Sequence, residues 1–319
     1  MQMKAKTIFN HGDTRVRLSS GAYRKLTRVS PWFIFFIVVL FANCRPDPID
    51  IDVPPADEKL VIASQIIPNS VMVVGLTRSF SPLDPGGNAD TIQNDFLDRI
   101  LVQNAIVTVT HSSGTDTLYM VTPGIYASIS VLLEEYGTYT IHAKDPSTGE
   151  EVSATTELLP QIQFDSIQPY IGTDAITHDS VPFIHYELTD FPNSEDYYVA
   201  CYYRKSQDTS AFDISNYFAQ GTNQLSAFQL LADQDFDANH HLSRNQQLSG
   251  VGINDTIACT VAHITKGYYE FLSAYQRSSS LFNQLSGEPI NYPTNVQNGY
   301  GYFATQFPDI RIYALPDYH

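Results

Sequence analysis

The sequence predicts an all-β protein built from two antiparallel β-sandwich domains. From Leu60 onward, short runs rich in Val, Ile, Thr and Tyr are separated by Gly, Pro, Asn, Asp and Ser, which is the pattern of strands joined by turns. No long amphipathic stretch intervenes in the first half of this region, and that spacing favours antiparallel strands over a parallel sheet with crossover helices. About 275 residues follow the N-terminal leader, so two domains are expected.

Residues 1–43 are predicted to be a signal peptide. Seven basic residues precede the apolar run Trp32–Ala42, which has the length of a signal-peptide core and is too short to span a bilayer as a helix. Cys44 follows almost directly, and the small residue Ala42 two positions before it resembles a bacterial lipobox. In such signals the cysteine is diacylated, becomes the new N-terminus and holds the protein on a membrane.

Two positions depart from the usual lipobox, because Asn43 replaces a small residue and Phe41 replaces the commoner Leu. A plain secretory signal, or a membrane-anchored N-terminus with an incidental cysteine, is therefore the alternative interpretation. Met1 and Met3 are both plausible start residues. Residues 44–58 are rich in proline and acidic residues and predict a linker.

The chain is strongly acidic once the leader is set aside. The whole chain has 18 Lys+Arg and 34 Asp+Glu; the leader holds seven of the bases and one of the acids, which leaves a formal charge of −22. Such a surface argues against nucleic acid as a partner, because phosphates require clusters of Lys and Arg. It suits an exported protein that is kept soluble by self-repulsion.

The first sandwich is predicted to cover residues 59–159. Three hairpins are expected, each from two alternating runs around a turn: Leu60–Ile67 with Val71–Thr77, Ala105–Thr110 with Thr117–Val121, and Tyr136–Ala143 with Glu151–Thr156. Gly149 supplies the positive φ that the last turn requires. The order and spacing of these strands and turns resemble those of transthyretin-like or carboxypeptidase-regulatory sandwiches. That resemblance implies a binding or spacer module.

The second sandwich is predicted to cover residues 160–319 and to be immunoglobulin-like. Pro160 marks its start, because proline ends a strand. The tyrosine-rich run Tyr197–Arg204 is expected to pair with Asp255–Ile264. One helix is expected near residues 268–277, where apolar side chains fall at helical spacing; its apolar face is expected to pack on this sandwich.

Several segments together resemble the DUF4249 lipoproteins of Bacteroidota. They are Ile49-Asp-Ile-Asp52, Lys59-Leu-Val-Ile62, Phe164-Asp-Ser-Ile167, Asp196-Tyr-Tyr-Val199, Tyr268-Tyr-Glu-Phe-Leu272 and the tail segment Glu288–Phe303. The resemblance covers the whole mature chain. It implies an outer-membrane lipoprotein of uncharacterised function, often encoded beside TonB-dependent receptors and without assigned catalytic residues.

The tail offers the candidate binding surface. Tyr292, Tyr300, Tyr302 and Phe303 are flat amphipathic rings, which are useful for binding sugars, peptides or a partner protein. Pro293, Asn298, Gly299 and Gly301 force irregular backbone between them. The competing interpretation is a C-terminal strand that closes the second sheet, with the glycines allowing close backbone approach.

No catalytic, cofactor-binding or metal-ligating residue is assigned. Asp233, Asp235 and Asp237 have the alternate spacing of a calcium loop, but Ala238 and Arg244 stand where that loop needs Gly and Glu. The neighbouring His240 and His241 would point to opposite faces of a strand. A Ser-His-Asp triad could be drawn from His185, His263, Asp255 and several serines, but the chain lacks a Gly-x-Ser-x-Gly elbow, and such sets of residues occur in any chain of this size.

The two remaining cysteines leave a choice open. Cys201 and Cys259 both lie in strand-like runs, and in an oxidising compartment they could pair. We favour two buried, unpaired thiols that pack as small hydrophobic residues.

These observations predict a non-enzymatic outer-membrane lipoprotein, anchored through Cys44, that binds a ligand or partner as an accessory of a TonB-dependent outer-membrane receptor. Two other hypotheses stand beside it. The first is a stand-alone surface adhesin or structural lipoprotein, which predicts a broad exposed apolar patch. The second is a metal-dependent hydrolase, which predicts a pocket with converging His and carboxylate groups. No cofactor is expected.

Overall fold

The computed structural model describes residues 58–67, 71–80, 99–131, 133–205, 228–278 and 291–318. The predicted signal peptide, Cys44 and nearly all of the predicted linker lie outside these residues and stay predictions. The described residues are mostly strand with one α-helix of several turns, which confirms the predicted all-β class. No helix among them is both long enough and apolar enough to cross a membrane.

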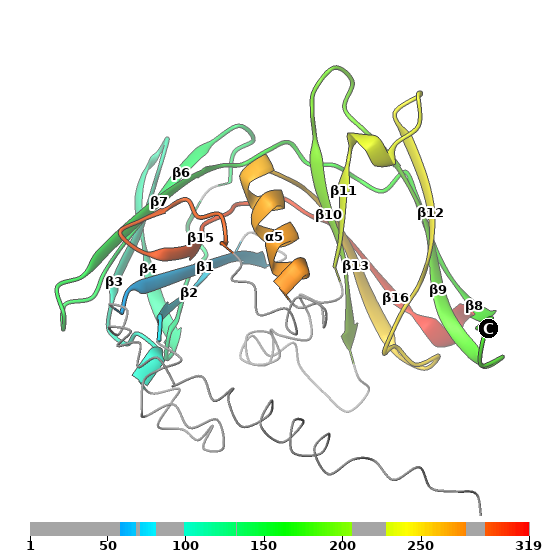
Figure 1. The fold of residues 1–319 in the computed structure, drawn as a ribbon, viewed down its shortest axis with the longest axis horizontal. Helices are drawn as coiled ribbons and strands as arrows, with labels where there is room; N and C mark the ends of the chain where they lie inside the picture. Colours follow the sequence, from blue (N-terminus) through cyan, green and yellow to red (C-terminus); the bar gives the residue numbers. More distant parts are fainter. Residues whose placement is uncertain are drawn as a thin grey trace, which may run out of the picture. The chain divides into compact units, whose positions relative to one another are not determined.

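A nine-stranded sheet forms the first part of the fold (Figure 1). Its strands are β1 (Leu60–Ile67), β2 (Val71–Arg78), β3 (Ile106–His111), β4 (Gly114–Thr122), β5 (Ile125–Ser128), β6 (Thr138–Lys144), β7 (Glu151–Glu157), β14 (Val296–Gln297) and β15 (Tyr300–Tyr302). They follow the order β14-β7-β6-β3-β4-β5-β2-β1-β15. The three predicted hairpins are confirmed as the antiparallel pairs β1–β2, β3–β4 and β6–β7.

Alternation along these strands builds one hydrophobic core. In β6 and β7 every second side chain is buried, including Tyr139, Ile141 and Ala154. Gly149, in the turn between these strands, has φ +79°, the left-handed conformation that the sequence predicted for it. The two faces of the hairpin therefore differ as the period of two requires, with mostly apolar residues inward and polar residues such as Thr140 and Thr155 outward.

The tail belongs to this first sheet, which corrects its predicted place in the second. β15 runs parallel to β1, pairing Gly301 with Ile62, and β14 runs antiparallel to β7. The reason is steric: a Cβ on Gly301 would lie 2.0 Å from the Ile62 carbonyl oxygen, and one on Gly299 would lie 2.5 Å from that of Leu60. Only glycine lets the tail backbone come this close. Residues 296–302 thus contain both edge strands of the first sheet, β14 and β15.

Two further sheets form the second part of the fold. One has the order β11-β10-β13-β16 and the other the order β12-β9-β8. Their strands are β8 (Ser166–Thr173), β9 (Ser180–Thr189), β10 (Tyr197–Lys205), β11 (Phe228–Ala232), β12 (His241–Gln247), β13 (Thr256–Ile264) and β16 (Asp309–Ala314), with short 3-10 turns η1 (Asp233–Asp235) and η2 (Leu315–Tyr318). The predicted pairing of the tyrosine-rich strand is confirmed as β10–β13.

The four-stranded sheet is covered on both faces. One face contributes Tyr198 and Val261 to a core shared with β9 and β12. The opposite face packs against α5 (Lys266–Ser278) through residues such as Val199 and Leu272, and Figure 1 shows α5 in orange alongside β10 and β11. The predicted helix and the packing of its apolar face are therefore confirmed.

Candidate functional site

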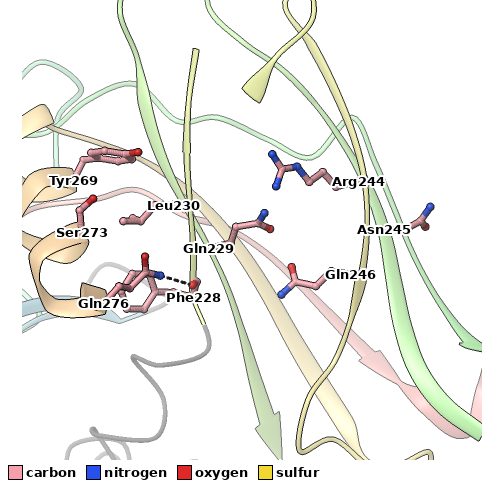
Figure 2. A pocket seen from close by; sticks show the side chains of 9 residues that line it. All are labelled: Phe228, Gln229, Leu230, Arg244, Asn245, Gln246, Tyr269, Ser273 and Gln276. Carbon is pink, nitrogen blue, oxygen red and sulfur yellow. Dashed lines mark hydrogen bonds between the residues drawn. The ribbon is translucent and has the colours of Figure 1, made fainter. Parts of the chain in front are cut away.

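An open cavity of about 550 Å³ lies along the outer edge of β11. Its lining residues come from β11, β12 and α5: Phe228, Gln229, Leu230, Arg244, Asn245, Gln246, Tyr269, Ser273 and Gln276. In Figure 2, Arg244 and Gln246 point from β12 toward Gln229, while Tyr269, Ser273 and Gln276 approach from α5. The volume lies within the usual range for small-ligand sites.

The strand β11 divides this cavity into two sides. Phe228 and Leu230 face α5, where they join the core beneath the helix. Gln229 faces the other way, toward β12 (Figure 2). Because successive side chains of a strand point to opposite faces, a molecule lying along β11 would meet the helix on one side and β12 on the other.

Side chains occupy both ends of the β11 edge. The Gln276 amide nitrogen donates to the Phe228 carbonyl oxygen at 2.9 Å. At the other end, the Ala232 backbone N–H donates to an Asp235 carboxylate oxygen at 3.0 Å, and Arg244 forms an ion pair with the second oxygen of that carboxylate. Fixed side-chain partners of this kind shield a strand edge from uncontrolled pairing.

Polar, uncharged side chains dominate the β12 side of the cavity. The Gln229 side-chain oxygen accepts a hydrogen bond from the Tyr186 hydroxyl at 2.8 Å. Burial raises the pKa of Tyr186 to about 12, so this phenol stays protonated and its bond fixes the orientation of the Gln229 amide. Gln229 lines the cavity, and with its oxygen bonded to Tyr186 its amide nitrogen is the group that can donate to a ligand.

Asn245 lies on the far side of β12 from the other lining residues (Figure 2). Its side-chain oxygen is 3.1 Å from a ring nitrogen of His185, on the outer face of the three-stranded sheet. It therefore contributes to the rim, whereas Gln246 projects inward. Of the lining residues that the structure describes, Arg244 and Tyr269 are the ionisable ones, so the cavity offers hydrogen-bonding groups with little net charge.

The four aromatic residues predicted as a binding surface are separated by the structure. Tyr292 is 43% exposed and Tyr300 is 46% exposed, whereas Tyr302 and Phe303 are buried. The Tyr302 ring packs against Tyr268 and Phe271 of α5, with centroids 5.3 and 5.4 Å apart. The two buried rings thus join the tail to the helix, and an exposed binding role stays a prediction for Tyr292 and Tyr300 alone.

An asparagine just before these residues fixes the tail. The Asn295 amide nitrogen donates to the carbonyl oxygens of Phe303 at 2.7 Å and Thr155 at 3.0 Å, and its side-chain oxygen accepts from the Phe303 backbone N–H at 2.9 Å. One side chain therefore makes two hydrogen bonds within the tail and one from the tail to β7. The tail is a structural closure of the first sheet.

Each of the three alternate carboxylates has its own local partner. Asp233 accepts the Asp196 backbone N–H at 2.8 Å, Asp235 holds the end of β11, and Asp237 accepts the N–H groups of Asn239 and His241. The last two hydrogen bonds lower the pKa of Asp237. Within the described part of the chain, no group of three or more His, Cys, Asp and Glu side chains is arranged to hold a metal ion.

The residues considered for a catalytic triad, His185, His263 and Asp255, do not come together in the structure. The ring of His263 is 3.0 Å from an Asp196 oxygen, His185 contacts Asn245, and Asp255 pairs with Arg204 at 2.7 Å. Asp255 and His263 are eight positions apart along extended chain, a distance of roughly 26 Å.

His263 belongs instead to a buried polar network. Burial lowers its pKa, although the Asp196 carboxylate opposes that shift. The neighbouring Tyr198 hydroxyl donates to the buried carboxylate of Asp190. Buried polar groups of this kind need their partners to avoid a large desolvation cost, so the network specifies how the loop before β10 packs.

The two cysteines are free thiols, as favoured from the sequence. Cys201 lies opposite Thr260 in the β10–β13 ladder, while Cys259 lies opposite Tyr202. Because neighbouring residues on a strand alternate in direction, the two sulfur atoms belong to opposite faces of the sheet. Burial raises the pKa of Cys201 to about 11 and that of Cys259 to about 12.

The fold and the cavity define an all-β protein with a polar ligand-sized site at a sheet edge. The family model described as "Domain of unknown function (DUF4249)" matches residues 46–307, and the chain belongs to this family. No curated protein matches the sequence. A solved structure titled "Cytokine receptor complex - Crystal form 1A" aligns with 81% of this chain and 96% of its own at 8% identity and a TM-score of 0.21, which carries no argument about fold or function.

Proposed function

We propose that this protein is a lipid-anchored, non-enzymatic binding protein of the outer membrane and that the cavity beside β11 is its binding site. The cavity carries the proposal. It combines a ligand-sized volume, oriented amides on one side, and a tyrosine and a serine on the other. Convergent hydrogen-bonding groups of this kind fix the orientation of a bound ligand.

The chemistry of the lining supports binding more than catalysis. General acid–base work needs a titratable side chain near the operating pH, and the carboxylates nearest the cavity are committed to structural contacts. Asp235 is held between the Ala232 N–H and Arg244. The amides that remain can donate and accept hydrogen bonds at any physiological pH.

The location rests on the sequence. Cys44 follows an apolar signal core, and the acidic body of the chain suits the exterior of a membrane to which a lipid tethers it. The resemblance to DUF4249 lipoproteins implies genes beside TonB-dependent receptors. We therefore propose that the protein presents its ligand to such a receptor.

Purification from native membranes in mild detergent tests this proposal. Mass spectrometry is expected to find a diacylated Cys44 at the N-terminus and a stoichiometric TonB-dependent receptor, and a Cys44→Ser variant is expected to leave the membrane fraction. An unmodified N-terminus would refute the anchor. A Gln246→Ala variant that keeps full ligand transfer would refute the assigned site.

One observation favours the adhesin hypothesis as the second candidate. The strand β4 exposes Tyr119 and Val121 by 71% and 57%, and Ile129, just after β5, is 84% exposed. Exposed apolar side chains this close together on one sheet are typical of interaction surfaces. A lipidated protein that purifies without a receptor, and loses surface attachment when Tyr119 and Val121 are both changed to Ser, would favour this function.

A further inference from the structure

The geometry points to an extended peptide as the ligand: we propose that a short basic peptide segment adds to the edge of β11 as a fifth strand of the four-stranded sheet. This inference rests on the proposed binding function of the cavity and names its ligand class. Strand addition to a sheet edge gives affinity through main-chain hydrogen bonds and specificity through pockets for alternate side chains.

The direction of the backbone groups on β11 follows from its neighbours. In an antiparallel edge strand, alternate residues direct both N–H and C=O toward the neighbouring strand or away from it. The Phe228 carbonyl accepts from Gln276 and the Ala232 N–H donates to Asp235, so both residues direct these groups away from β10. Leu230 lies midway between them, two positions from each, so its N–H and C=O also point away from β10.

Leu230 is therefore the open position of this edge. β11 pairs with β10 alone among the strands that the structure describes, and Leu230 lines the cavity. Its N–H and C=O can together bond one residue of an incoming strand, as a hydrogen-bonded pair of an antiparallel ladder does. The side chains of Gln276 and Asp235 shield the two ends of this edge by bonding to the backbone of Phe228 and Ala232. This limits the added strand to a few residues.

The walls of the cavity fit the two faces of such a strand. Side chains on one face would meet Gln229 and Gln246 between the sheets, and those on the other would meet Tyr269 and Ser273 on α5 (Figure 2). Amide and hydroxyl groups favour polar side chains on the peptide. Walls on both sides of a strand edge suit an extended backbone that pairs with that edge more than a compact ring-shaped ligand.

The negative net charge of the chain favours a positively charged peptide. The body after the leader carries −22, and a field of that sign raises the local concentration and the association rate of cations. Arg244 is already paired with Asp235, so it adds little positive charge to the cavity. The bound segment is accordingly a basic one, and its affinity falls as salt is added.

The test uses the lipidated full-length protein in detergent and an octapeptide of alternating Thr and Lys blocked at both ends. Two matched probes accompany it: the same peptide N-methylated at its four central residues, and an alternating Thr and Glu peptide. Binding is measured by calorimetry, and hydrogen exchange is followed in β11. We expect the Thr/Lys peptide to bind, to slow exchange at Leu230 about tenfold, and to bind roughly tenfold more tightly than either probe.

Two variants separate backbone pairing from side-chain packing. Leu230→Pro removes the outward N–H, a change that an edge strand tolerates, and is expected to abolish binding. Leu230→Val keeps the N–H and is expected to bind normally. Circular dichroism spectra establish that both variants fold.

Three results would overturn the inference: no binding of the Thr/Lys peptide at millimolar concentration, equal binding of the N-methylated peptide, or protection of Leu230 before any peptide is added, which would show that the chain itself covers this edge. The proposed function fails separately. If co-purified ligand is lost in Gln246→Ala but is not a peptide, the cavity binds and only the strand addition is wrong; if Gln246→Ala changes nothing, both proposals fall.

Discussion

Replacing Gly301 by alanine tests how the tail closes the first sheet. Gly301 has φ +93° and pairs with Ile62 of β1. An alanine Cβ would lie 2.0 Å from the Ile62 carbonyl oxygen and 2.9 Å from its carbonyl carbon. These are backbone atoms of a core strand, so no side-chain rotation can relieve the contact, and β15 must move away from β1.

The cost can be worked from these contacts. A left-handed backbone costs a non-glycine residue roughly 1–2 kcal/mol. Moving β15 also breaks about two hydrogen bonds of its short ladder with β1, at about 1 kcal/mol each. We expect Gly301→Ala to lower the free energy of unfolding by about 3–4 kcal/mol.

Gly149→Ala is the matched control. Gly149 has φ +79°, but a Cβ there would meet no atom within 4 Å, so the control carries the backbone cost of about 1–2 kcal/mol alone. Thermal unfolding followed by circular dichroism should separate the two variants by about 2 kcal/mol, or roughly 4–8 °C for a domain of this size. If Gly301→Ala melts no lower than Gly149→Ala, the steric account of the closure is wrong.

Three other predictions follow from the same structure. Asn295→Ala removes two hydrogen bonds within the tail and one from the tail to β7 and should cost about 2–3 kcal/mol in urea unfolding; a loss below about 0.5 kcal/mol would contradict the fixing role. Folding lowers the pKa of His263 below its ordinary value of 6.5. At a pH just below 6.5 the unfolded state therefore binds more protons than the folded state, and the free energy of unfolding should fall as the pH drops from about 7.5 to about 5.5. His263→Gln should flatten that slope, whereas His142→Gln, at an exposed site, should not. Burial raises the pKa of both thiols, with Cys259 buried and Cys201 half-buried, so iodoacetamide at pH 8 should label both much faster once urea is added; equally fast labelling of the native protein would contradict the raised pKa values.

Local features of the fold could be predicted from the sequence. The hairpin around Gly149 follows from alternation and one turn glycine, and α5 follows from the spacing of Tyr268 and Phe271. Each of these signals lies within a few residues of the structure it specifies. Periodicity therefore predicts such elements before any tertiary contact is known.

The pairing of the tail could not be predicted in this way. Gly301 meets Ile62 across most of the length of the chain, and no periodic pattern tells which of several sheets a short strand will join. The glycines did signal close backbone approach, but the partner strand had to come from the structure. The position of the tail in the sequence suggested that it joins the second sheet. The close backbone contacts of Gly299 and Gly301 place it in the first sheet instead.

The cavity was missed for a related reason. Gln229, Gln246 and Gln276 come from two strands and a helix that are separate in the sequence, and amide side chains carry no spacing signature. A weak signal did exist, because Gln229 interrupts the apolar run Phe228–Ala232. One polar residue on a buried strand indicates a special environment without identifying its neighbours.

The closure of the first sheet has a consequence for the order of folding. Its first strand is among the earliest parts of the body to be synthesised, yet β14 and β15 are made only after more than two hundred further residues. Domains generally fold from the N-terminus as they emerge, but here β1 and β7 keep unpaired edges until almost the whole chain has been synthesised. The sheet that is begun first thus waits for two of the last three strands of the chain, and while it waits its open edges let aggregation compete with folding.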